Sequence, residues 1–198
     1  HAQTSADFEK NNMVLGRYFS PDIKNEIEET GLNFSEYIPK NLNVAVLFTD
    51  IVGFTKLSEK MEPNDVLELL SEYQTIMVEC IFEFNGTVDK FIGDAVMANF
   101  GTPKSYGNDA QNAFNCAKKM KSMLHEWNKN RIDNKQKIIE HRIGIHYGEC
   151  IVGNVGGEKR VEYTVLGDTV NVASRLCDLS KVFNNDLLIS KALYDQIE

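Results

Sequence analysis

Two aspartates stand where apolar segments of this sequence end. Asp50 follows the apolar run Val44–Phe48 and precedes Gly53, and Asp94 follows Gly93 between two further apolar segments. A carboxylate at the end of a buried strand is costly to desolvate unless a cation or hydrogen-bond donors compensate it. No histidine or cysteine stands beside either aspartate, and oxygen donors alone suit a hard cation such as Mg²⁺. We therefore expect both carboxylates at one edge of a sheet, bound to metal ions that also contact phosphate oxygens.

Such a pair of carboxylates suits phosphoryl chemistry. Two ions held by Asp50 and Asp94, with the Ile51 carbonyl as a further oxygen ligand, would clamp the attacking and leaving oxygens of an in-line displacement. A helix that starts at Phe54, with Thr55 next, would point its free N–H groups at a triphosphate. The alternative is that Asp50 is only a helix cap and Asp94 only a turn residue.

Asn171 and Arg175 are four residues apart, so on a helix they share one face. An arginine beside an amide suits a pentavalent phosphate, because the arginine stabilises developing charge while the amide orients the ribose. The alternative for Arg175 is a surface ion pair with Asp178.

Three segments of the chain resemble the class III nucleotidyl cyclases in order and spacing. They are Phe48-Thr-Asp-Ile-Val-Gly-Phe54, Lys90-Phe-Ile-Gly-Asp94 and Gly167-Asp-Thr-Val-Asn-Val-Ala-Ser-Arg175. The resemblance runs from about Arg17 to the end of the chain, and three separated motifs make it specific. It implies that Asp50 and Asp94 hold the metal ions and that the Asn/Arg pair acts on the transition state.

The resemblance also assigns Lys90 and Thr164 to recognition of the base. Adenylyl-type members have Lys at the first position and Asp or Thr at the second, and Thr marks a bacterial-type subgroup. Guanylyl-type members have Glu and a small thiol or hydroxyl residue there. A lysine donor to adenine N1 and an acceptor for the exocyclic amine suit ATP, although a threonine hydroxyl can both donate and accept. The alternative for Lys90 is a solvent-facing strand residue.

The resemblance therefore implies an adenylate cyclase that converts ATP to 3′,5′-cyclic AMP and pyrophosphate with two Mg²⁺ or Mn²⁺ ions, for intracellular signal transduction. The rival functions are a guanylate cyclase and a catalytically silent nucleotide-binding module. Family sites lie at a homodimer interface, with the metal aspartates from one chain and the Lys, Thr, Asn and Arg from the other.

The resemblance also predicts the organisation of the chain. Residues 1–42 are expected to be a lead-in from an upstream sensor or regulatory domain, the alternative being a packed N-terminal arm without a regulatory role. Residues 43–198 are then the catalytic domain. Members usually continue into a further strand or two with a phosphate-binding lysine, so those C-terminal strands are expected to be missing.

Apolar spacing and turn residues predict the elements that must position these groups. The expected strands are residues 43–48, a hairpin over 87–100, 141–147, 150–155 after a Gly148-Glu149 turn, 163–166 and 187–189. The expected helices are residues 22–29, a long helix from Pro63, 107–129, one capped by Asp168, and 190–197, with a polar loop over 129–139. The long helix should bury Val66, Leu70, Tyr73, Met77, Cys80 and Phe84. This order predicts an α+β fold, a mainly antiparallel sheet with helices packed on it; the ferredoxin-like, palm-like core is what the resemblance implies.

Composition excludes some partners. The 198 residues carry a net charge of −8, so the chain lacks the basic surface that nucleic acid or an anionic membrane requires. The four cysteines have no metal-binding spacing and are expected to be reduced core thiols in a cytoplasmic protein. His146 stands alone on its strand, and a structural role is expected for it. No apolar run reaches membrane-spanning length.

Overall fold

The computed structural model describes residues 19, 21–30, 40–157 and 160–198. The helices in the described ranges are α2 (Pro21–Thr30), α3 (Phe54–Glu59), α4 (Pro63–Glu83), α5 (Asp109–Asp133), α6 (Asp168–Leu179) and α7 (Lys191–Tyr194). The strands are β1 (Lys40–Ile51), β2 (Thr87–Ile92), β3 (Ala95–Phe100), β4 (His141–Gly157), β5 (Arg160–Leu166) and β6 (Leu187–Ile189). Most of the predicted lead-in lies outside the described residues.

The strands form one sheet in the order β2-β3-β1-β4-β5, with β6 beside β4. Strand β1 is central and antiparallel to both β3 and β4, and β6 pairs with β4 in parallel. This arrangement confirms the predicted α+β class with a mainly antiparallel sheet. The predicted hairpin over residues 87–100 is also confirmed, with Gly93 at a φ of 59° in its turn.

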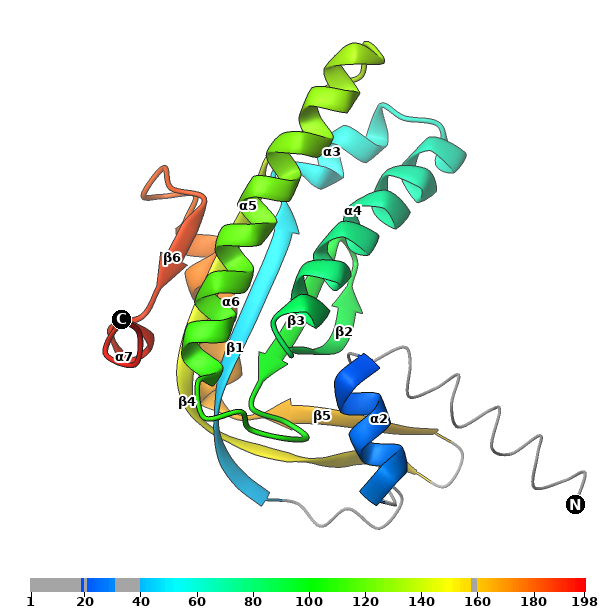
Figure 1. The fold of residues 1–198 in the computed structure, drawn as a ribbon. Coiled ribbons are helices and arrows are strands. Elements are labelled where there is room, and N and C mark those ends of the chain that lie inside the picture. The colour runs from blue at the N-terminus through cyan, green and yellow to red at the C-terminus, as the bar shows by residue number, and fades with distance from the viewer. Residues whose placement is uncertain (1–18, 20, 31–39, 158–159) are drawn as a thin grey trace, which may run out of the picture.

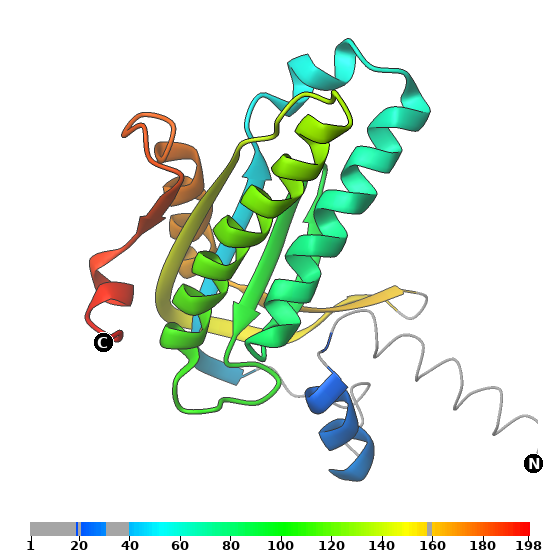
Figure 2. The ribbon, with the colours of Figure 1, turned by 45° about the horizontal axis from the view of Figure 1, so that its top comes forward.

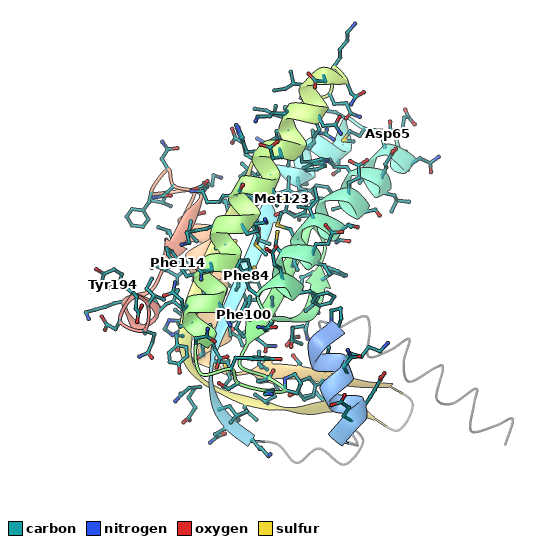
Figure 3. The ribbon with its side chains drawn as sticks, viewed as in Figure 1. Asp65, Phe84, Phe100, Phe114, Met123 and Tyr194 are labelled. Carbon is teal, nitrogen blue, oxygen red and sulfur yellow. The ribbon has the colours of Figure 1, made fainter. Side chains whose placement is uncertain are left out.

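Helices α4 and α5 cover one face of the sheet (Figures 1 and 2). The main apolar core lies between these helices and the sheet. Alternate residues of β1, among them Ala45, Leu47 and Ile51, contribute to it because successive side chains of a strand point to opposite faces. Figure 3 shows Phe84 and Phe100 where the two helices meet the sheet. The predicted stripe of α4 is confirmed at Tyr73, Met77 and Cys80, which are buried, whereas Val66, Leu70 and Phe84 are half-buried.

The opposite face of the sheet is covered by α6 and by a long bent arm. Strand β4 runs for 17 residues and curves away from β1, and its end pairs with β5 to form this β4–β5 arm (Figure 1). Val152 and Val165 of the arm join Val46 of β1 and Ala173 of α6 in a second apolar cluster. The arm therefore folds back over the sheet face that α4 and α5 leave free.

Three expectations about local structure were wrong. Gly148 and Glu149 make no turn, because β1 begins at Lys40 and pairs with β4 through both residues. Helix α5 continues to Asp133, and the buried Arg131 donates from Nε to the Lys137 carbonyl at 2.8 Å. Gly167, not Asp168, is the N-cap residue of α6, and no side chain caps that helix.

Other features agree with the sequence analysis. All four cysteines are free and buried. His146 contacts the Ser190 hydroxyl at 2.7 Å, and that hydroxyl in turn accepts from Leu193 N at the start of α7, a contact of the structural kind expected for this residue. Within the described ranges, no helix has both the length and the apolar character needed to cross a membrane.

Candidate functional site

Asp50 lies near the end of β1, where its partner across the sheet is Arg142 of β4. Arg142 donates from Nε to Oδ1 at 3.0 Å and from Nη2 to Oδ2 at 3.2 Å. Both side chains are 18% exposed, so this two-pronged ion pair is shielded from bulk water without being fully buried. The partner that the sequence required for Asp50 therefore includes a cation supplied by the protein itself.

Asp94 lies beside the same end of β1. Its Oδ2 accepts a hydrogen bond from Ile51 N at 2.9 Å, which ties the turn of the β2–β3 hairpin to the central strand. Asp94 is also close enough for its charge to raise the pKa of Asp50. The structure thus brings the two predicted carboxylates together, as their positions at strand ends required.

The environment of Asp50 favours additional positive charge. Burial raises the pKa of Asp50, the hydrogen bond and charge of Arg142 lower it, and the negative charge of Asp94 raises it again; the balance is upward. A carboxylate has about four lone-pair positions, so the Arg142 contacts leave others available. A divalent cation between Asp50 and Asp94 would relieve both the desolvation and the repulsion.

The donor set fits a hard metal ion that keeps water or substrate ligands. Among the described residues, no group of three or more His, Cys, Asp and Glu is arranged to hold a metal. Two carboxylates with a backbone carbonyl nearby are what Mg²⁺ accepts when phosphate oxygens complete its coordination. Asp50, Asp94 and the Ile51 carbonyl are therefore the residues that would hold the ions.

The turn after β1 leads directly into α3 and presents backbone N–H groups at the start of that helix. Gly53 has a φ of 66°, a left-handed conformation that glycine adopts without strain, and α3 starts immediately after it. The half-buried Phe54 packs on the main core, and Thr55 is exposed. The N–H groups of this turn are the part that a phosphate would contact.

Lys90 and Thr164 come from distant strands and meet at one residue, Asp89. A register shift in β2 between Val88 and Lys90 marks a bulge at Asp89, a feature that re-aims side chains. Thr164 Oγ1 donates to Asp89 Oδ1 at 2.8 Å, and Lys90 Nζ lies 3.7 Å from the same oxygen. The β4–β5 arm therefore unites the two predicted base-recognition residues in one chain, although β2 and β5 occupy opposite ends of the strand order.

Asn171 and Arg175 lie on the exposed side of α6. In the described part of the chain, no ion pair joins Arg175 to Asp178, and no hydrogen bond joins either residue to Asp50 or Asp94. Their helix lies directly against β4 at Gly144, where an added Cβ would come within 2.2 Å of Cys177 N. The two side chains thus face outward from a firmly seated helix.

A cavity of about 550 Å³ lies between α5, the start of β4 and the segment after α6. Arg142 borders it, whereas Asp50, Asp94, Lys90 and Thr164 do not. None of the predicted site residues lines this cavity.

Sequence reasoning missed two residues of the site. Arg142 is the charged residue of β4 that the antiparallel pairing with β1 places opposite Asp50, and that pairing is the signal that could have identified it. Asp89 stands beside Lys90 in an otherwise apolar strand, and a carboxylate there requires donors for the same reason as Asp50.

Comparison with known proteins gives a consistent result. Residues 36–195 match the family described as "Adenylate and Guanylate cyclase catalytic domain". Adenylate cyclase 1 of Rhizobium meliloti is 33% identical over 190 residues, covering 87% of this chain but only 29% of that protein. The solved structure of the adenylyl cyclase CyaB from P. aeruginosa is 36% identical with a TM-score of 0.73, covering 81% of this chain and 82% of that one. The guanylyl cyclase Cya2 is 32% identical with a TM-score of 0.74, covering 80% of each chain.

Proposed function

Because this chain belongs to the family of adenylate and guanylate cyclase catalytic domains, we propose that it converts ATP to 3′,5′-cyclic AMP and pyrophosphate. The observation that carries the choice of ATP is the meeting of Lys90 and Thr164 at Asp89. A lysine ammonium is a donor for adenine N1, and the neighbouring hydroxyl offers an acceptor for the adenine amine.

In the proposed reaction the ribose 3′-oxygen attacks the α-phosphorus and its proton passes to water. The bond from the α-phosphorus to the oxygen that bridges it to the β-phosphate breaks, and pyrophosphate leaves. Asp50 and Asp94 would hold divalent cations, Mg²⁺ or Mn²⁺, and these ions would supply the positive charge that activates the attacking hydroxyl and offsets the charge of the leaving pyrophosphate. Arg175 stabilises the charge that develops on the phosphorus oxygens, and Asn171 orients the ribose. The N–H groups at Phe54 and Thr55 contact the triphosphate.

The site is proposed to form between two copies of this chain. Asn171 and Arg175 face outward on α6 without contact to Asp50, which supports their action on a partner's substrate. Several large apolar side chains are exposed on β2 and on the β4–β5 arm, and exposed apolar surface often marks an interface; they are Phe91, Ile92, Ile151, Val155 and Leu166. A homodimer would then contain two equivalent sites.

The proposed regulation and cellular location of this domain depend on the proposed cyclase activity. The chain spans 29% of the length of the Rhizobium meliloti relative, so a sensor or regulatory region joined through residues 1–42 to the catalytic domain at 43–198 is proposed as the source of control. Four free buried thiols suit a reducing compartment, which supports a cytoplasmic reaction in signal transduction.

A guanylate cyclase is the second candidate because Cya2 resembles this chain nearly as well as CyaB does. Lys90 argues against it, since a lysine cannot accept a hydrogen bond from guanine N1. Purified protein at high concentration with Mn²⁺ should form cyclic AMP from ATP and little cyclic GMP from GTP. Cyclic GMP as the main product would select the second candidate, and binding of ATP without any product would indicate a silent module.

A further inference from the structure

Asp89 is the common contact of the two residues proposed to recognise the base. It is 4% exposed and sits at the bulge in β2. Its Oδ2 accepts from Val165 N at 3.0 Å and from Thr164 Oγ1 at 3.0 Å, and its Oδ1 accepts from Thr164 Oγ1 at 2.8 Å. Lys90 Nζ lies 3.7 Å from Oδ1.

These contacts suit the ionised form of the carboxylate. Burial raises the pKa of Asp89, and the hydrogen bonds from Val165 and Thr164 and the charge of Lys90 lower it; the balance is upward. An ionised carboxylate can only accept hydrogen bonds, and every neighbour named here is a donor. The backbone N–H of Val165 cannot change its role, so it fixes one oxygen as an acceptor.

In this arrangement the only hydrogen of the Thr164 hydroxyl is donated to the Asp89 carboxylate. The other acceptor near that hydroxyl, the Val165 carbonyl, is farther away at 3.3 Å. Thr164 is 3% exposed, so water has little access to reorient the group. Thr164 can then offer a bound molecule only the lone pairs of Oγ1. The side chain of Lys90 is 35% exposed, so a base would reach Lys90 and Thr164 from the side of Lys90.

We propose that Asp89 is a positioning residue for base selection: it holds the Thr164 hydroxyl as a donor to itself and so converts an ambiguous threonine into an acceptor for the 6-amino group of adenine. This inference deepens the proposed function and rests on it. Guanine has a carbonyl at position 6, and two acceptors facing each other repel. An alcohol that could rotate freely would accept either base.

The test compares ATP with purine riboside triphosphate, which has hydrogen in place of the 6-amino group. In Asp89→Asn, the amide oxygen must take the place facing Val165 N, because the opposite orientation would set two donors against each other. The amide NH₂ then donates to Thr164 Oγ1 and takes up a lone pair that the wild-type hydroxyl offers to the base. The ratio of kcat/KM for ATP over the analogue should fall about tenfold, the size expected for one buried hydrogen bond to a substrate.

Two further variants separate this role from a structural one. Thr164→Val should lower the same ratio, and adding Asp89→Asn to it should cause no further fall, because the two residues act through one hydrogen bond. Thr164→Ser keeps the hydroxyl and should keep the ratio. Asp65→Asn, on the exposed start of α4 (Figure 3), removes one carboxylate elsewhere and should leave the ratio unchanged. Where Asp89→Asn does not fold, the smaller Asp89→Ser takes its place.

Equilibrium titration of both nucleotides with the same proteins distinguishes this inference from the proposed function. Turnover by the wild type with an unchanged ratio in a folded Asp89 variant would overturn the inference and leave the cyclase function standing. If the Asp89 variants shift the ratio of the two binding constants but no protein forms cyclic AMP, the cyclase function is overturned and the role of Asp89 in base selection stands. A wild type that binds neither nucleotide would overturn both.

Discussion

Arg142 and Asp50 face each other across β4 and β1, and the guanidinium contacts both carboxylate oxygens, at 3.0 and 3.2 Å. The contact fixes the orientation of the carboxylate and opposes the rise in its pKa that burial causes. Arg142 is therefore placed to tune a proposed metal ligand without binding the metal itself.

Replacing Arg142 by Met should weaken the metal site and the fold together. The Mn²⁺ concentration for half-maximal activity should rise about tenfold, as is common when a partner of a metal ligand is lost. The free energy of unfolding should fall by about 2 kcal/mol, because a mostly buried carboxylate loses its cation. Metal titration of cyclic AMP formation and urea denaturation measure the two effects.

Arg142→Lys keeps the charge but not the two-pronged contact, so it should fall between the wild type and Arg142→Met. Lys119→Met removes an exposed ion pair with Glu83 and serves as the control that should change neither quantity. An unchanged Mn²⁺ requirement in a folded Arg142→Met protein would contradict the role given to this pair.

Mixing two inactive variants should restore activity if the site lies between two chains. Asp50→Ala lacks a proposed metal ligand and Arg175→Ala lacks the cation proposed to act on the transition state, and each should lose nearly all turnover alone. Half of the randomly mixed dimers contain both variants, and each of these has one intact site of two, so recovery should approach about a quarter of wild-type activity. Failure to recover any activity in verified mixed dimers would place both residues in the same chain's site.

Local signals were sufficient for part of this molecule. The hairpin at Gly93 was predictable because the turn residue and the flanking apolar runs are adjacent in sequence. The convergence of Asp50 and Asp94 followed from their positions at strand ends, and the structure confirms it through the hydrogen bond from Ile51 N to Asp94.

The features that local sequence patterns did not predict depend on pairing between segments far apart in the chain. The Gly148-Glu149 pair has the composition of a turn, but β1 extends back to Lys40 and holds both residues in β4. The contact between Asp89 and Thr164 spans 75 residues and depends on the bend of the β4–β5 arm. No periodicity within either segment encodes that bend, so only the folded structure shows the contact.

His141 should make the fold sensitive to acid. It is 3% exposed, near Tyr73, Lys121 and Asp186, and burial lowers its pKa to about 4. The unfolded chain takes up a proton near pH 6.5, whereas the folded protein resists it until about pH 4. Stability is therefore fully present above pH 6.5 and falls as the pH drops, by about 3 kcal/mol at pH 4.

Urea denaturation between pH 7.5 and 4, with EDTA present to exclude metal effects, measures this loss. The titration of other groups also contributes, so the comparison is with His141→Gln, which cannot take up the proton. The variant should be less stable at neutral pH but should lose about 3 kcal/mol less on acidification. Parallel pH curves for the two proteins would show that His141 is not the responsible group.

Gly144 should be essential for seating the helix that carries Asn171 and Arg175. A Cβ at this position would lie 2.2 Å from Cys177 N and 2.6 Å from the Ala173 carbonyl oxygen, both backbone atoms of α6. The helix cannot yield as a side chain would, so Gly144→Ala should lower the free energy of unfolding by about 3 kcal/mol. Activity should fall about a hundredfold if Asn171 and Arg175 act as proposed, because small displacements of catalytic groups are costly.

Gly148→Ala is the matched comparison for this prediction. Its Cβ would meet the Thr169 hydroxyl at 2.7 Å, and that side chain can rotate away at the cost of its hydrogen bond to the Glu149 carbonyl. The expected loss is about 1 kcal/mol, with activity largely kept. Urea denaturation and cyclic AMP formation rank the two variants. Equal effects would mean that α6 adjusts to β4 freely, and the position of Arg175 would then not depend on the close contact at Gly144.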